Sequence, residues 1–434
     1  MKTKEKTVNP AMKKSKGKLA AKILGIFLAI VVVIAAVTAL INFMGDKANT
    51  EKALSFPKVE TEKQLVPEKD ENGYWTFTTD EDFKVLQLTD VHIGGGWMSL
   101  KKDAMALNAV ASMITAEKPD LVVVTGDIAY PVPFQAGTFN NLASAKVFAA
   151  LMEQLGVYWT LGFGNHDTEA YSYFGRDDLS EFYSGEDMKY CLFQPGPDDV
   201  DGFGNQVINV KNSDGIITQS LFVFDSHSYV DGDFLGIFWK YDNIHENQVL
   251  WYKNTLNALN AQNNAKLKEM GKEENSHIKS AAFFHIPLTE QRDAWYEYRD
   301  AGYQDTEKVK LHYGVAGEGG SVVYCGIHED NLFETMVELD STKAVFCGHD
   351  HDNNFSIEYE GIRLTYGMSV DYLAYPGIYK RGAQRGCTMI SFAPDGSFSC
   401  TQENYYQDKY ESVYEKEAVD MQELTNAPLT EDAE

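Results

Sequence analysis

The sequence has little positive charge for its length. Its 434 residues include 38 Lys and Arg against 64 Asp and Glu, which gives a formal net charge of −26. Residues 1–22 contribute +7 through eight Lys and one Glu, so the rest of the chain carries −33. Nucleic-acid-binding proteins need a basic surface, and this composition therefore argues against a DNA or RNA partner. An acidic surface also keeps an exported protein soluble.

Cysteine is scarce, and the motifs of covalent catalysis are missing. The five cysteines are odd in number and irregularly spaced, without the pairs of a zinc finger or a redox centre. An oxidising exterior would allow some of them to pair, with a connectivity that the sequence does not define. No G-x-S-x-G motif is present, and GEGGS after Ala316 lacks the strand-to-helix context of a nucleotide loop.

One apolar run is long enough to cross a bilayer as a helix. It extends from Ile23 to Met44 without a charge and follows a lysine-rich segment. Positive flanks stay in the cytoplasm, which predicts that the rest of the chain lies outside. A cleaved signal peptide is the alternative, because small residues from Ala35 to Ala39 offer a processing site. The length of the run favours an uncleaved anchor.

Short apolar segments recur through the rest of the chain. Near-continuous apolar runs of this length predict strands buried on both faces, and helical stretches such as Ala104 to Ala116 separate them. The pattern therefore predicts an α/β fold. The predicted strands are FKVLQL, DLVVVT, VYWTLGF, SLFVFD, SAAFF and KAVFC.

Potential metal ligands follow most of these strands, at the ends where loops carry chemistry. Carboxylate, imidazole and amide oxygen together suit a divalent ion such as Mn, Fe, Zn or Mg. A carboxylate such as that of Asp127 can bridge two ions roughly 3.5–4 Å apart. The residues are Asp90 and His92 in LTDVH, Asp127 in TGD, Asn165, His166 and Asp167 in GNHD, His285 in FFHIP, and His349 and His351 in GHDH.

The order D-x-H, GD, GNHD, H, GHDH resembles that of the calcineurin-like metallophosphoesterases. FFHIPLTE, KAVFCGHDHDNNF and YEGIRLTYG resemble a branch with fungal phosphatases and plant proteins classed with purple acid phosphatases. The resemblance implies a β-sandwich flanked by helices, in four layers α/β/β/α. It implies a first metal on Asp90, His92, Asp127 and His351. It implies a second metal on Asp127, Asn165, His285 and His349.

The resemblance also implies a mechanism. Two divalent ions would activate a water for in-line attack on phosphorus and neutralise the charge on the phosphoryl oxygens. His166 would protonate the leaving alkoxide, and Asp167 would orient the imidazole of His166.

The first two motifs depart from those of true purple acid phosphatases. Those enzymes have D-x-G and GDxxY, whose tyrosine binds ferric iron, whereas this chain has both His92 and Tyr130. We favour His92 as the ligand, since imidazole suits a divalent ion, and Tyr130 then lines the cleft. Tyr130, His227 and Glu318 are candidates for contact with substrate.

These observations predict five segments and a function. We expect a membrane-anchored, outward-facing phosphomonoesterase that acts on a small molecule or a phosphoprotein. The alternatives are a phosphodiesterase on cyclic nucleotides, nucleotides or glycerophosphodiesters, and a non-catalytic surface binding protein, against which His166 argues. The segments are a cytoplasmic tail at 1–22, a transmembrane signal-anchor at 23–44, a linker at 45–76, a metallophosphoesterase domain at 77–408 and an acidic tail at 409–434.

Overall fold

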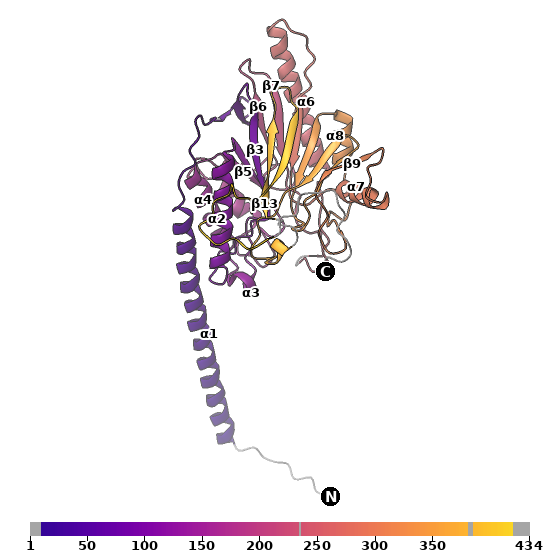
Figure 1. The fold of residues 1–434 in the computed structure, drawn as a ribbon. Helices are drawn as coiled ribbons and strands as arrows, with labels where there is room; N and C mark the ends of the chain where they lie inside the picture. The colour runs from indigo at the N-terminus through magenta and orange to yellow at the C-terminus, as the bar shows by residue number, and fades with distance from the viewer. Residues whose placement is uncertain (1–9, 234–235, 381–384, 420–434) are drawn as a thin grey trace.

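The structure is a computed structural model that describes residues 10–233, 236–380 and 385–419, with side chains from residue 18 onward. Its globular part contains two stacked β-sheets with helices on their outer faces (Figure 1). In sheet order, the smaller sheet consists of β14 (Phe398–Asn404), β13 (Gly386–Phe392), β3 (Phe83–Leu88), β4 (Leu121–Thr125) and β5 (Trp159–Gly162). The larger sheet consists of β1 (Glu68–Lys69), β2 (Trp75–Thr78), β6 (Gln206–Lys211), β7 (Ile217–Val223), β8 (Lys279–Phe283), β10 (Thr342–Cys347), β12 (Ile362–Tyr366), β11 (Ser356–Tyr359) and β9 (Val309–Tyr313).

The helices complete a four-layer arrangement. The buried core that includes the smaller sheet also includes side chains of α2 and α4, whereas a second core includes α6, α7 and α8. The predicted α/β class and layer order are confirmed. The helices are α1 (Pro10–Ala53), α2 (Leu100–Glu117), α3 (Pro133–Ala136), α4 (Asn141–Leu155), α5 (Arg176–Tyr183), α6 (Glu246–Glu269), α7 (Thr289–Asp300), α8 (Leu332–Leu339) and the short 3-10 helix η1 (Ile378–Lys380).

Alternate side chains of the central strands serve the two cores. On β8, Ala281 and Phe283 belong to the core shared with the smaller sheet, while Ala282 belongs to the core under the outer helices. Successive side chains of a strand point to opposite faces, so a strand between two apolar layers must be apolar throughout. The predicted strands are continuous apolar runs for this reason.

Parallel pairing brings the functional ends of the strands together. β3, β4 and β5 are parallel neighbours in the smaller sheet. β7, β8, β10 and β12 are parallel neighbours in the larger one. The loops that leave their carboxyl ends therefore gather at one end of the sandwich, which we call the carboxyl end.

The segment predicted as a linker, 45–76, differs from that expectation. α1 continues to Ala53, Ala53 and Val59 are buried in the core, and β1 and β2 join the larger sheet. The prediction of a linker was wrong because polar side chains of this segment form hydrogen bonds with the domain. Asn49, for example, donates to the Asp103 carboxylate at 3.0 Å.

The start of the predicted acidic tail is also part of the domain. Tyr410 is buried, and Glu417 pairs with the buried Arg385 at 3.1 Å. Residues 420–434 of that tail, and residues 1–9 of the predicted cytoplasmic tail, lie outside the described residues. All five cysteines are free thiols.

Candidate metal centre

Four side chains from three distant motifs meet at the carboxyl end. Asp90, His92, Asp127 and His351 each offer one ligand atom, and these atoms all lie within 4.8 Å of one another. All four residues are buried. They come from the loops after β3, β4 and β10, as the sequence predicts.

One carboxylate oxygen of Asp90 accepts hydrogen bonds, and the other accepts none from any described residue. Its Oδ2 accepts from the Thr89 hydroxyl at 2.7 Å and from the His349 backbone N–H at 3.1 Å. Its Oδ1 lies 3.3 Å from His351 Nε2 and 4.0 Å from His92 Nε2. The open oxygen therefore faces two imidazole nitrogens.

Asp127 occupies the position between two halves of the site. Its Oδ1 accepts the backbone N–H of His166 at 2.8 Å. Its Oδ2 lies 3.2 Å from His92 Nε2 and 3.3 Å from His285 Nε2. Burial raises the pKa of this carboxyl, but the neighbouring imidazoles, His285 first, outweigh burial and hold the pKa well below its usual value. Asp127 therefore stays ionised, as a shared ligand requires.

The second half of the site gathers around His285. Its Nε2 lies 3.1 Å from Asn165 Oδ1 and 3.3 Å from His349 Nδ1. Asn165 donates its amide Nδ2 to the Tyr229 hydroxyl at 3.0 Å, so its carbonyl oxygen faces His285. These three ligand atoms, His285 Nε2, Asn165 Oδ1 and His349 Nδ1, form with Asp127 Oδ2 a second cluster beside the first.

Hydrogen bonds from the far side of each ring orient the imidazoles. His285 Nδ1 lies 2.8 Å from the Thr125 carbonyl, which fixes the proton on Nδ1 and leaves Nε2 as a ligand. Asp371 hydrogen-bonds His351 Nδ1 at 3.1 Å, and its other oxygen lies 3.5 Å from His92 Nδ1, close enough for an electrostatic contact. Asp371 was not predicted from the sequence. Its position just after β12, another parallel strand, is the signal that was available.

The loop backbone is strained where the ligands lie. Asp90, His92, Asp127 and His349 have φ angles of 50°, 53°, 54° and 79°, in the left-handed region that non-glycine residues seldom occupy. Such conformations persist only where the surrounding structure enforces them, and they concentrate at functional sites.

Two motif glycines are explained by close approach. A Cβ on Gly164 would lie 2.1 Å from Asp127 Oδ1, and one on Gly348 would lie 1.8 Å from Thr89 Oγ1. Both contacts are far inside van der Waals distance, so only glycine lets these loops approach the carboxylates.

His166 lies at the rim, with a partner that was not predicted. Its Nδ1 is 2.7 Å from Glu169 Oε1, and its side chain is 28% exposed. Tyr229 donates to the same Glu169 oxygen at 2.9 Å, which links His166 to Asn165. The sequence contains Glu169 only as one more acidic residue in a polar loop, without a signal that singles it out.

Asp167 has a different role from the predicted one. Its carboxylate accepts backbone N–H groups from Asp127, Ala129 and Gly164 at 2.8–3.0 Å. Burial, followed by the charge of Asp127, raises its pKa to about 6. Asp167 thus clamps two ligand loops together, and Glu169 contacts the imidazole of His166 in its place.

Tyr130 lies beside His92 and does not replace it. The two rings stack with centroids 4.6 Å apart and planes 12° apart, and Tyr130 meets His166 edge-on at 4.9 Å. Burial raises the pKa of Tyr130 to about 12, which opposes a phenolate. Tyr130 therefore lines the site between the metal-binding cluster and His166.

The other two predicted substrate contacts lie away from the cluster. Glu318 is buried, and its carboxylate accepts the backbone N–H of Asp352 at 3.2 Å, which positions the loop that carries His351. His227 stacks on His245 at 4.0 Å and hydrogen-bonds Gln248 at 3.0 Å. These contacts of Glu318 and His227 are with residues outside the metal-binding cluster.

The residues present fit a pair of metal ions. Asp90 Oδ1 is buried and accepts no hydrogen bond from any described residue, although His351 Nε2 is near. His285 Nε2 and His349 Nδ1 face each other at 3.3 Å. Because Nδ1 of His285 is bonded to the Thr125 carbonyl, its Nε2 presents a lone pair to this cluster, and carboxylate, imidazole and amide ligands together suit a divalent cation. The expected dinuclear centre is confirmed as to its type, without the identity of the metal.

Comparison with known proteins agrees with this centre. Residues 83–353 match the Calcineurin-like phosphoesterase family, and the chain belongs to this family. It is 29% identical to "Probable inactive purple acid phosphatase 28" of Arabidopsis thaliana, over 69% of this chain and 73% of the relative. It is 30% identical to "Phosphatase DCR2" of Saccharomyces cerevisiae, over 73% of this chain and 51% of the relative. The predicted resemblance is thereby confirmed.

Two solved structures also match this chain over most of its length. A dimetal phosphatase from Danio rerio matches 76% of this chain and 98% of its own, with 12% identity and a TM-score of 0.47. Purple acid phosphatase PPD1 from yellow lupin matches 80% of this chain and 57% of its own, with 11% identity and a TM-score of 0.38. The protein is a metal-dependent phosphoric ester hydrolase by family and by the nature of its site.

Proposed function

We propose that the protein is a membrane-anchored, outward-facing phosphomonoesterase with two divalent ions. The position of Asp127 Oδ2, 3.2 Å from His92 Nε2 and 3.3 Å from His285 Nε2, supports this most directly. One carboxylate oxygen shared between two sets of nitrogen ligands is the arrangement that a bridged pair of ions requires.

Each ligand then has one assignment. When bound, the ions supply an activated water and neutralise charge on the phosphoryl oxygens. Asp127 belongs to both sets. The first ion would take Asp90, His92 and His351, and the second would take Asn165, His285 and His349.

His166 would give its proton to the leaving alkoxide. Its ring is partly exposed, whereas the side chains of His92 and His285 are fully buried. Glu169 accepts from Nδ1 and so turns the other ring nitrogen outward, where a leaving oxygen can reach it. The Arabidopsis thaliana relative is named as probably inactive, and this chain has the potential ligands, the imidazole of His166 and its carboxylate partner Glu169.

Aromatic side chains on two sides favour a monoester. Tyr130 covers His92 on one side, and Tyr241 meets His349 edge-on at 4.2 Å on the other. Both side chains are half-buried, so each lines the site with part of its ring. A terminal phosphoryl group needs room for one ester substituent, whereas a diester needs room for two.

The membrane assignment rests on α1. Residues 18–53 form a helix apolar and long enough to span a bilayer, and none of its most apolar window is buried by the domain. A soluble protein would bury such a surface. The lysines that precede the span favour a cytoplasmic N-terminus and an external catalytic domain.

The test of activity uses the full-length protein in detergent, stripped of metal and reloaded with Mn, Fe, Zn or Mg. Turnover of p-nitrophenyl phosphate faster than that of bis-p-nitrophenyl phosphate is the expected result. The reverse order would assign a phosphodiesterase. Two bound ions with no hydrolysis of either substrate would instead indicate a non-catalytic surface binding protein.

The test of anchoring uses cell membranes. The full-length protein should stay in the membrane pellet through alkaline carbonate extraction. Protease added to intact cells whose outer wall has been removed should digest the catalytic domain. Release of the protein by carbonate would contradict the anchor. Protection of the domain from protease would reverse the orientation.

A further inference from the structure

α1 leaves the catalytic domain beside the metal centre. Asn42 donates its side-chain amide to the Gly137 carbonyl at 3.0 Å and accepts from the Trp97 backbone N–H at 2.9 Å. Trp97 lies in the loop that follows His92, and Gly137 lies in the loop that follows Asp127. The loops that carry metal ligands are thus the loops that hold the helix.

These contacts fall within the apolar span. Asn42 precedes Met44, the end of the uncharged run, by about 3 Å of helix rise. α3 also lies at the lower end of the domain in Figure 1, on the side toward which α1 extends. If α1 crosses a bilayer, the carboxyl end of the sandwich lies at the membrane surface.

That end of the domain exposes a continuous group of large apolar side chains, which we call the apolar rim. Phe134 on α3 is 90% exposed, and Tyr173 is 67% exposed. Trp97, Met98 and Phe139 are also exposed. Met98 N–H donates to the Ala136 carbonyl at 3.1 Å, and Phe139 stacks on Tyr173 at 5.8 Å, so the five residues adjoin one another.

Aromatic rings beside basic residues are typical of a membrane interface. Trp and Tyr concentrate at the headgroup level, and lysines reach the phosphates there. Lys101 and Lys102 lie on the first turn of α2, directly after the rim segment Trp97–Met98, in a chain that is otherwise acidic. Both classes of side chain are thus found where α1 leaves the domain.

The rim is connected to the metal centre by short contacts. Gln135 of α3 donates to the Leu373 carbonyl at 3.3 Å. Two residues further on, Tyr375 packs against the His351 ring at 4.4 Å. Tyr130, which stacks on His92, precedes α3 in the same loop. One layer of loops therefore separates the potential ligands from the exposed aromatics.

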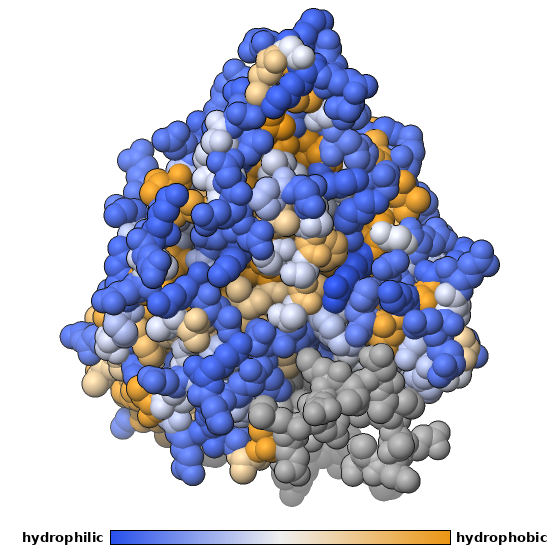
Figure 2. Space-filling view, turned by 45° about the horizontal axis from the view of Figure 1, so that its top comes forward, coloured by the Kyte–Doolittle hydropathy of each residue, from blue (hydrophilic) through white to orange (hydrophobic). Residues whose placement is uncertain are grey.

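The face that includes the top of the molecule in Figure 1 is different. Figure 2, which brings the top of Figure 1 forward, shows a largely hydrophilic surface with orange confined to a central strip and small separate patches. Large apolar side chains are also exposed elsewhere, at Val66 and Leu250 for example, but the apolar rim gathers five of them in one place.

We propose that the apolar rim lies in the bilayer interface and turns the metal centre toward it, so that the substrate is a phosphate monoester carried by a membrane lipid. This inference rests on the proposed function, since it requires both the anchor and the hydrolase. It adds the orientation of the domain and the class of the substrate. The phosphate of such a lipid lies at the level of the headgroups, which the rim would reach.

The orientation is tested with a fluorophore at the rim. Phe134→Cys in the full-length protein is labelled with an environment-sensitive dye and reconstituted in phosphatidylcholine vesicles that contain spin-labelled lipid. We expect quenching by the spin label. Val66→Cys is the matched control, since Val66 is 65% exposed and its neighbour Gln64 bonds Gly156, which precedes β5 at the far end. Equal quenching at both positions, or none at Phe134, would overturn the orientation.

The substrate class is tested with the same preparation. Vesicles of phosphatidylcholine with a minor share of phosphatidic acid present the lipid monoester, and p-nitrophenyl phosphate presents a soluble one. Phe134→Asp should lower hydrolysis of phosphatidic acid about tenfold, the partition cost of one large apolar side chain, and leave p-nitrophenyl phosphate turnover unchanged. Val66→Asp should change neither.

The outcomes separate this inference from the function on which it rests. Hydrolysis of p-nitrophenyl phosphate without hydrolysis of phosphatidic acid would overturn the lipid substrate and leave the phosphomonoesterase standing. An equal loss on both substrates in Phe134→Asp would also overturn the lipid substrate, because the substitution would then have impaired the structure of the domain and not its contact with the bilayer. Failure on both substrates with two ions bound would remove the proposed function itself.

Discussion

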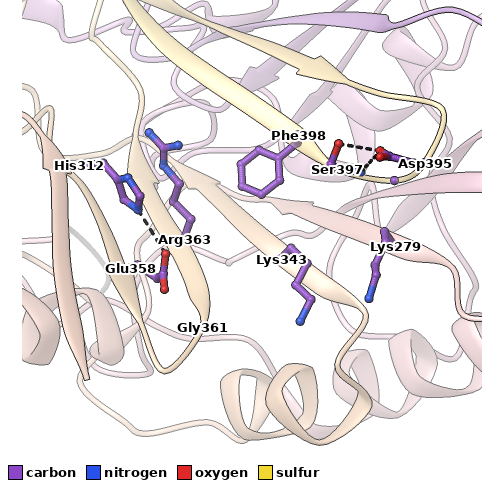
Figure 3. Close-up of a pocket in the computed structure, with 10 residues that line it drawn as sticks. Lys279, His312, Lys343, Glu358, Gly361, Arg363, Asp395, Ser397 and Phe398 are labelled. Atoms are coloured by element: carbon purple, nitrogen blue, oxygen red, sulfur yellow. Dashed lines mark hydrogen bonds and ion pairs between the residues drawn. The ribbon is translucent and has the colours of Figure 1, made fainter. Parts of the chain in front are cut away.

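The two ends of strands β8 and β10 differ sharply. At their carboxyl ends these strands lead to the buried His285 and to His349, which face each other. At their amino ends they carry Lys279 and Lys343, which line an open groove between the β11–β12 and β13–β14 turns (Figure 3). Both lysines pair with Asp340.

The difference lies in how polar groups are satisfied. In the groove, Asp395 accepts from Ser397, and His312 pairs with Glu358, so the charges have local partners and contact with water. At the metal end, Asp90 Oδ1 is buried and accepts no hydrogen bond from the described residues. A buried polar atom without a partner is costly, and a bound cation removes that cost. The open oxygen of Asp90 thus marks the carboxyl end as the place where a bound cation would be stabilising.

The largest effect is expected from Asp127→Asn. The change removes the charge of the oxygen shared by both clusters, so we expect loss of at least one of two bound ions and of hydrolysis. Metal content after gel filtration and turnover of p-nitrophenyl phosphate measure both. Asp395→Asn, at the opposite end, should retain two ions and full turnover. Two ions retained in Asp127→Asn would disprove the bridging role.

His166→Ala should lower turnover roughly 100-fold without loss of metal, as removal of a general acid does. The loss should be larger for glycerol phosphate than for p-nitrophenyl phosphate, because nitrophenolate leaves without a proton. His312→Ala is the control from the groove and should leave both rates unchanged. An equal loss on both substrates would show that His166 positions the phosphate instead.

Asp371→Asn should weaken binding of the first ion by about 10- to 100-fold, the usual effect of removing the partner of a ligating imidazole. The reason is that one carboxylate orients both His92 and His351. Titration of the stripped protein with Zn or Mn measures the change. An equal weakening at both ions would point to a general loss of structure.

Glu169→Gln and Asp167→Asn should have different consequences. Gln retains an acceptor for His166 but not the charge, so we expect less than tenfold loss of turnover, with glycerol phosphate again affected more.

Asp167→Asn should lower the melting temperature, because Asp167 joins the loops of Asp127 and Gly164. A loss of turnover in Asp167→Asn without a lower melting temperature would instead indicate that Asp167 orients the imidazole of His166.

The ligand positions could be predicted from sequence because each follows its own strand. Asp90, Asp127 and His285 lie directly beyond β3, β4 and β8, and parallel strands bring such ends together. Which carboxylate faces His166 could not be predicted in this way. Asp167 is adjacent in sequence but points to backbone N–H groups, while Glu169 returns to the ring. That choice depends on the path of a loop.

The length of α1 beyond the apolar run was also not predictable from composition. Residues after Met44 are polar, and polar residues are typical of linkers. The domain offers partners to those residues, as the Asp103 carboxylate does to the side chain of Asn49. Hydropathy therefore located the apolar run but not the place where the helix meets the domain.

The smallest effect is expected in the groove, from Lys343→Met. Its ion pair with Asp340 is exposed to water, and exposed pairs contribute about 1 kcal/mol or less to the free energy of unfolding. Urea unfolding should therefore change little, and metal content and turnover should not change at all. A large loss of activity would mean that the amino ends of β8 and β10 communicate with His285 and His349, and would contradict the division of the fold into a binding end and a solvated end.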